Sequence, residues 1–154
     1  MFHFLPTDNL CGDGIRLQLA RTMEADEEKG YVPAYLFFVC LQEGTPVGAC
    51  TLRVGDVPSL YHSGHIGYGI HEDYRGHGYA GKACKLLFAL AKQHGMKSLY
   101  ITCEPDNIPS DRTLRRLCAE WEGGGRFLET SPIPEEHEMY REGRRQVNVY
   151  QFDL

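Results

Sequence analysis

The sequence contains no apolar stretch long enough to cross a membrane. The apolar run Tyr35–Leu41 is far shorter than the roughly 20 residues that a transmembrane helix needs. Met1 is followed by neither a basic start nor a long apolar stretch, so we expect no secretory signal. We therefore expect a cytoplasmic protein without a membrane partner.

Basic residues are also few. Lys and Arg number 16 against 21 Asp and Glu, which gives a formal net charge of -5 at pH 7. This charge repels the phosphates that dominate affinity for nucleic acid. We therefore expect no nucleic-acid partner.

No two cysteines have the C-x-x-C spacing of a metal or redox site. We interpret the six cysteines as reduced, intracellular and mostly core residues. Histidines cluster at His62, His65, His71 and His77, but no acidic or cysteine partner stands at a fixed spacing from them. The sequence therefore predicts no metal site.

The composition is that of a globular domain. The chain has 154 residues, of which 42% are hydrophobic and 24% charged, and disordered chains are poorer in apolar side chains. This length fits one domain, and no repeat or low-complexity segment interrupts it. We therefore expect a single domain over residues 1–154.

Apolar periodicity divides the chain into short elements. The strongest helical spacing runs from Gly78 to His94, and Gly95 ends it where a left-handed cap would lie. The other expected elements are a strand at 1–5, a helix at Ile15–Met23, a hairpin at 35–54, strands at His65–Ile70 and Ser98–Cys103, a helix at Asn107–Cys118 and an antiparallel pair in the tail. Strand, helix and strand in succession favour one parallel pair. The predicted fold class is mixed α/β, with a mostly antiparallel central sheet, one parallel strand pair and flanking helices.

The glycine-rich segment Arg75–Gly81 lies between a predicted strand and the strongest helix. Its glycines fit G-x-G-x-x-G, and Glu104 lies about 20 residues on, as in a dinucleotide-binding fingerprint. In that motif the first glycine ends the strand directly, whereas several residues separate Ile70 from Gly76 here. A dinucleotide fold also needs several strand-helix-strand units, and this chain has one. The dinucleotide interpretation is therefore the weaker one.

The same segment fits a second motif. Arg75, Gly78 and Ala80 match R-x-x-G-x-A, which resembles the acyl-CoA pyrophosphate loop of the GNAT superfamily of N-acetyltransferases. The segment Gly67–Gly76 looks like that family's fourth strand running into this loop, and residues 107–110 are similar to the N-x-x-S start of its next helix. The chain is further similar to a subgroup of predicted acetyltransferases whose substrates are unassigned. The resemblance implies the GNAT-like acyl-CoA N-acyltransferase fold.

The resemblance also implies acetyl-CoA as cosubstrate. Backbone N–H groups of a glycine-rich turn, together with the helix that follows it, offer converging donors and a positive dipole end to a pyrophosphate. The residues expected to bind it are Ile70, Arg75, Gly76, His77, Gly78, Tyr79, Ala80, Gly81, Asn107 and Ser110. Two alternatives stay open: the loop is a helix entry without a ligand, and Asn107 and Ser110 are helix caps.

Acetyl transfer to an amine needs a base, an oxyanion donor and an acid for the thiolate. His65 stands where the family commonly has Glu before Ile-Gly-Tyr, so it is either the base or a strand residue bonded to a carbonyl. The glycines around Tyr68 favour a bulge with unpaired amides as oxyanion donors. The tyrosine that many relatives have seven residues after the asparagine is Leu114 here. The acid is therefore Tyr68 or water, or the thiolate leaves unprotonated. If Tyr68 is not the acid, it is an ordinary aromatic residue of the strand.

These observations predict an enzyme that moves acetyl from acetyl-CoA directly to a primary amine in a ternary complex. A covalent relay through Cys103 is the alternative mechanism, and a non-catalytic acyl-CoA sensor is the alternative function. The amine is unassigned: a small metabolite, a polyamine, an antibiotic or a peptide terminus. The acidic run Glu135–Glu138 either attracts that amine or is a solvated surface. A homodimer also stays open.

Overall fold

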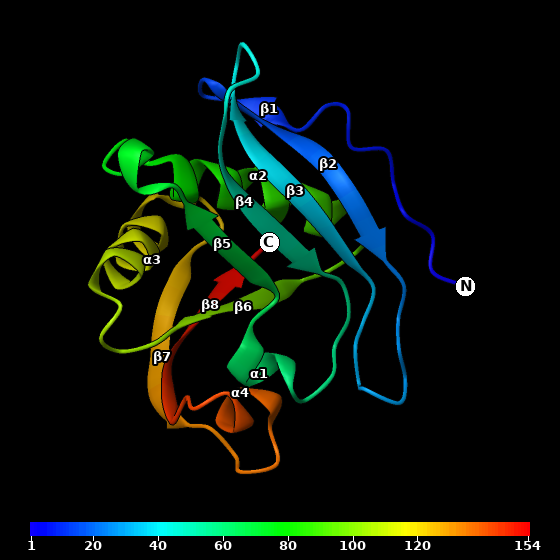
Figure 1. Ribbon diagram of the computed structural model, residues 1–154, viewed down its shortest axis with the longest axis vertical. Coiled ribbons are helices and arrows are strands. Elements are labelled where there is room, and N and C mark those ends of the chain that lie inside the picture. The colour runs from blue at the N-terminus through cyan, green and yellow to red at the C-terminus, as the bar shows by residue number, and fades with distance from the viewer.

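The strands form two antiparallel sheets in the computed structural model, which describes residues 1–154 (Figure 1). The first has the order β1-β2-β3-β4-β5, with β1 at Cys11–Gly12, β2 at Ile15–Met23, β3 at Ala34–Leu41, β4 at Pro46–Arg53 and β5 at Ile66–Ile70. The second has the order β6-β8-β7, with β6 at Ser98–Cys103, β7 at Gly125–Pro132 and β8 at Gln146–Asp153. The predicted mixed α/β class and the hairpin at 35–54 are confirmed. The predicted parallel pair is not confirmed, because β5 and β6 belong to different sheets.

Two elements near the N-terminus differ from the prediction. Ile15–Met23 is a strand and not a helix: Ile15 and Leu17 are buried while Arg16 and Gln18 are exposed, which is the two-residue period of a strand. Residues 1–5 form no strand. Instead Phe2 and Phe4 pack against the core, and the Leu5 N–H donates to the Tyr35 hydroxyl at 2.8 Å.

The two long helices lie where the periodicity places them. They are α2 at Tyr79–Gln93 and α3 at Ile108–Glu120, and short turns form α1 at Leu60–Ser63, η1 at Glu72–Tyr74 and α4 at Glu138–Arg141. One face of α2 is fully buried through Ala83, Cys84, Leu87, Phe88, Leu90 and Ala91. These side chains pack on the inner side chains of β3 and β4 in one core of 24 residues. No helix is long and apolar enough to span a membrane.

The two sheets meet at a single point before they separate. The His65 N–H donates to the Tyr100 carbonyl at 2.7 Å, and the Tyr100 N–H donates back to Nδ1 of His65 at 3.0 Å. From this junction β5 and β6 run on in separate sheets, so the remaining edge of β5 has no strand partner. A cleft opens beside that edge.

Candidate functional site

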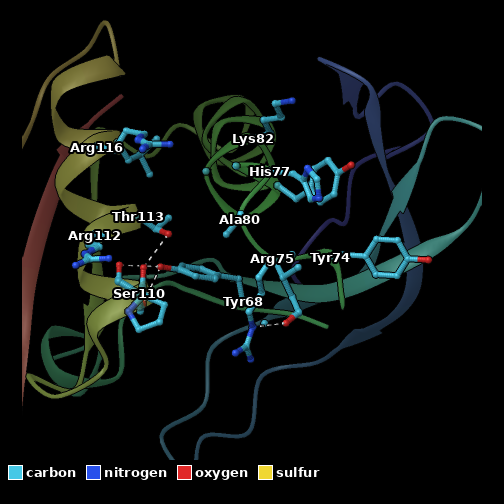
Figure 2. A pocket seen from close by; sticks show the side chains of 18 of the residues that line it. Tyr68, Tyr74, Arg75, His77, Ala80, Lys82, Ser110, Arg112, Thr113 and Arg116 are labelled. Atoms are coloured by element: carbon cyan, nitrogen blue, oxygen red, sulfur yellow. Dashed lines mark hydrogen bonds between the residues drawn. The ribbon is translucent and has the colours of Figure 1, made fainter. Parts of the chain in front are cut away.

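A cleft of about 680 Å³ lies between the end of β5, the start of α2 and the first turns of α3 (Figure 2). It brings together all ten residues predicted to bind the cofactor: Ile70, Arg75, Gly76, His77, Gly78, Tyr79, Ala80, Gly81, Asn107 and Ser110. Tyr68 also lines it, whereas His65 does not. Residues from three separate elements therefore converge on one site.

The start of α2 leaves its backbone donors free. Gly78, the N-cap, has a left-handed φ of 76°, no side chain caps the helix, and the first turn has no acidic residue. Gly76 has a φ of 88°, and a Cβ added at Gly76, Gly78 or Gly81 would meet nothing within 4 Å. The first N–H groups of a helix have no intrahelical partner. We call the segment Gly76–Gly81, with the first N–H groups of α2, the glycine cradle. It has both the donors and the space for a pyrophosphate, so its residues fit the cofactor.

Positive side chains surround this cradle, although the whole chain is acidic. Lys82 and Lys85 on α2 and Arg112 and Arg116 on α3 line the cleft. Only Lys85 has a carboxylate partner, Glu120, at 3.4 Å. Lys85, Arg112 and Arg116 were not predicted from the sequence, where the i,i+4 spacing of Arg112 and Arg116 was the signal available. The local charge favours an anionic ligand.

Arg75 is turned toward β5. Its Nε–H donates to the Ile70 carbonyl at 3.1 Å, a bond that Figure 2 marks. Since the guanidinium is exposed, it is still available to an anion at the mouth of the cleft. Its observed role is to tie the loop before α2 to the end of the strand.

The free edge of β5 offers two further donors. Pairing with β4 is regular from Gly48–Ile70 to Leu52–Ile66, so the predicted bulge is wrong. The His71 N–H donates to the Val47 carbonyl, which places the alternate residues of β5 on the β4 side. The N–H groups of Tyr68 and Ile70 therefore point to the open edge. They are free because β5 is an edge strand, not because it is bulged.

Tyr68 spans from β5 to α3. Its hydroxyl lies 2.8 Å from Oγ of Ser110 (Figure 2), and burial raises the pKa of Tyr68 well above its usual value. Asn107 caps α3, since its Oδ1 accepts from the Ser110 N–H at 3.3 Å. Leu114 is fully buried in the core. The Tyr68 hydroxyl is therefore protonated near neutral pH, whereas Leu114 does not line the cleft.

His65 is bonded through both ring nitrogens. It is only 4% exposed, its Nε2 donates to the Gly55 carbonyl at 3.0 Å, and its Nδ1 accepts from Tyr100. To accept a proton at Nδ1, the ring would have to give up the Tyr100 bond. Burial lowers the pKa of His65, which also disfavours the cation. The geometry favours the structural alternative.

We expect His65→Leu to lower the free energy of unfolding by about 1–3 kcal/mol for each backbone group left without a partner. His65→Gln can bond to both Gly55 and Tyr100, so its free energy of unfolding should stay close to that of wild type.

The lowered pKa of His65 gives the sign of the pH effect on stability. The unfolded state binds the proton first, so the free energy of unfolding falls as the pH drops below about 6.5. Urea unfolding of the three proteins between pH 5 and 8 tests this. Equal stability of His65→Leu and wild type would contradict it.

Cys103 does not suit a covalent relay. It is 7% exposed, and burial raises its pKa to about 11. The thiolate is the nucleophilic form of cysteine, so Cys103 is in the unreactive form near neutral pH. The burial of Cys103 therefore counts against the covalent relay.

Comparison with known proteins identifies the family of this chain. The family model described as the acetyltransferase (GNAT) family matches residues 13–119, which is more than half of the chain. The chain therefore belongs to the GNAT acetyltransferase family. No curated protein sequence matches it.

Solved structures share the fold at low sequence identity. The microcin C7 self-immunity acetyltransferase MccE, described in complex with acetyl-CoA and AMP, is 21% identical with a TM-score of 0.57, over 83% of this chain and 63% of its own. A ribosomal-protein-S5-alanine acetyltransferase from Vibrio fischeri is 18% identical with a TM-score of 0.56, over 78% and 61%. An acetyltransferase from Agrobacterium tumefaciens is 18% identical with a TM-score of 0.54, over 79% and 61%. The chain thus spans less than two thirds of the length of these proteins.

Proposed function

We propose that this protein is an N-acetyltransferase that moves acetyl from acetyl-CoA directly to a primary amine. One observation carries the proposal: the uncapped start of α2, with its open glycine cradle, lies beside the free amides of β5 in one cationic cleft. Family membership and the acetyl-CoA complex of MccE support the same cofactor. The named substrates of the similar structures differ, so they do not identify the amine.

The binding roles follow from the charges and donors in the cleft. The N–H groups at the start of α2 bind the pyrophosphate, and the open positions at Gly76 and Gly78 let its oxygens approach the backbone. Arg112 and Arg116 add attraction from α3. The edge amides of Tyr68 and Ile70 orient the rest of the bound molecule toward the junction of the two sheets. Acetyl-CoA, when bound, supplies an acetyl group activated as a thioester.

The catalytic roles fall to β5. An edge amide at Tyr68 or Ile70 stabilises the carbonyl oxygen as it gains negative charge. The Tyr68 hydroxyl, which stays protonated because burial raises its pKa, donates a proton to the departing sulfur, and the phenolate then takes a proton back from water. Water takes the proton of the amine, since both nitrogens of His65 are bonded. The reaction then needs no covalent enzyme intermediate.

A second candidate function is a sensor that binds acyl-CoA without turnover. The buried Leu114, at the position of the expected tyrosine, is the observation that favours it. Both functions use the same cleft, and they differ only in whether the acetyl group is transferred from the bound acetyl-CoA to an amine.

We expect the protein to bind CoA in calorimetric titration and to give no heat with NAD. With acetyl-CoA and a panel of primary amines, thiol release should exceed the rate without amine, because the ternary complex is the reactive one. Binding of CoA without amine-dependent thiol release would favour the sensor. Binding of NAD but not CoA would contradict both functions.

A further inference from the structure

A second cavity, of about 890 Å³, lies at the end of β4. Its walls come from the connection between β2 and β3, from α1 and from the segment around α4, which gather in the lower part of Figure 1. These segments are far apart in the sequence. The predicted acidic run Glu135–Glu138 forms part of this wall through Glu136, His137 and Glu138.

This cavity lies against the strand pair that also borders the cleft beside α2 and α3. Thr51 lines the cavity and pairs with Gly67, whose neighbour Tyr68 lines the cleft. Successive residues of a strand point to opposite faces, so the cavity and the cleft lie on opposite faces of the sheet. A Cβ at Gly67 would meet only Oγ1 of Thr51, at 3.1 Å. Gly67 therefore places no side chain on the cavity side of β5. The cavity reaches the junction of the two sheets through Ser63, which lies two residues before His65.

Arg53 forms the inner end of the cavity. Its Nη1 donates to the carbonyl oxygens of Gly64 at 2.9 Å and Ser63 at 3.5 Å. No carboxylate lies within 4.0 Å of it, and its Nε and Nη2 have no protein acceptor. It is half-buried, whereas the other lysine and arginines of the cavity are exposed.

A half-buried cation with no carboxylate in direct contact is costly. The Nε and Nη2 edge of a guanidinium matches a carboxylate in a bidentate pair. Burial lowers the pKa of Arg53, and Glu138 and Tyr31 partly offset this. An anion that entered the cavity would therefore accept hydrogen bonds from Nε and Nη2 of Arg53 and pair with its charge.

The rim of the cavity is acidic, in contrast to the positive charge of Arg53 at its inner end. It contains five glutamates: Glu24, Glu28, Glu136, Glu138 and Glu142. Arg144 lies within 3.7 Å of Glu142 and 3.9 Å of Glu104, so its charge is partly neutralised. The glutamates draw in an ammonium group, while Arg53 at the inner end selects an anion.

We propose that this cavity binds the acetyl acceptor and that the acceptor is an amino carboxylate, an amino acid or short peptide whose carboxylate pairs with Arg53. This inference rests on the proposed function and narrows its substrate class. The carboxylate would sit against the Nε and Nη2 edge of Arg53, with the amine directed toward the junction of β5 and β6.

Binding is tested without acetyl-CoA. The Nε–H signal of Arg53 in the NMR spectrum of isotope-labelled protein is assigned by its absence in Arg53→Lys. N-Acetyl-L-alanine and N-acetyl-L-phenylalanine should shift this signal in a saturable way, and their methylamides should bind at least about tenfold more weakly, because they lack the charge. An equal response to both classes, or no response to either, overturns the proposal.

Turnover gives the second test. The ratio of kcat/KM for L-phenylalanine over phenethylamine should be about 10 to 100 in wild type, as expected for a hydrogen-bonded charge pair. It should fall to about 1 in Arg53→Met, with Arg53→Lys between them because lysine lacks the fork. Arg21→Met, at an exposed position of β2 that lines neither the cavity nor the cleft, should keep the wild-type ratio. Each ratio is taken within one preparation, so partial unfolding cancels.

The outcomes separate this inference from the proposed function. Transfer to both amines with a wild-type ratio near 1 overturns the amino-carboxylate acceptor and leaves the acetyltransferase intact. Absence of transfer to any amine, with no CoA binding, counts against the acetyltransferase, while the NMR titration still decides whether Arg53 binds carboxylates.

Discussion

Gly78→Val should weaken CoA binding by about 10²- to 10⁴-fold, because it removes two or more charge-assisted bonds between backbone N–H groups and phosphate. A Cβ at this position meets no protein atom within 4 Å, so the branched side chain fills the space that phosphate oxygens need. Its left-handed φ of 76° also costs a non-glycine residue about 1–2 kcal/mol. Calorimetric titration with CoA measures the first effect and urea unfolding the second.

Gly95→Val separates the two effects. Gly95 lies just beyond the other end of α2 with a φ of 82°, and a Cβ there also meets nothing within 4 Å. The two variants should lose similar stability through backbone strain, but only Gly78→Val should lose CoA affinity. If Gly78→Val bound CoA like wild type, the pyrophosphate would not lie at the start of α2.

The cofactor loop was predictable because its determinants are local. Glycines that permit a left-handed backbone, a following helix and the spacing to Asn107 all lie in one continuous stretch of sequence. The positive lining from Arg112 and Arg116 needed the packing of α3 beside α2, which periodicity alone does not give. The second cavity was beyond prediction, since its walls join three connections that the sequence separates widely.

The wrong prediction of a helix at Ile15–Met23 has a related cause. The segment IRLQLARTM is rich in Leu, Arg, Gln, Ala and Met, which are good helix formers. A register shift also follows Leu19 in the pairing of β2 with β3. Strict alternation is therefore lost in its second half, and the apolar residues fall at mixed spacings. Pairing with β3 decides the outcome, and that contact is tertiary.

His65 shows how one residue type fits two roles until its neighbours are placed. Its position before Ile-Gly-Tyr matches that of a base, but the chain folds Gly55 and Tyr100 onto its two ring nitrogens. The side chain thereby fixes the point where the sheets meet. Since β5 and β6 separate from this point, we propose that His65 shapes the cleft as a positioning residue, and that the chemistry falls to Tyr68.

Tyr68→Phe should lower kcat by about 10²- to 10⁴-fold, the usual contribution of a positioned acid. The hydroxyl is the only group removed, and the ring still packs against the core. The dissociation constant of CoA should stay within about twofold, because the backbone amide of residue 68 is unchanged. Steady-state kinetics with acetyl-CoA and an accepted amine, together with CoA titration, give the two numbers.

Tyr74→Phe and Ser110→Ala are the matched controls. Tyr74 also lines the cleft, but it lies on the side away from α3 (Figure 2), so loss of its hydroxyl should leave kcat unchanged. Ser110→Ala removes the partner 2.8 Å from the Tyr68 hydroxyl and should lower kcat less than Tyr68→Phe, since the hydroxyl remains but is less well oriented. A kcat near wild type in Tyr68→Phe would mean that water protonates the thiolate or that the thiolate leaves unprotonated. Tyr68 would then serve only to bridge β5 and α3.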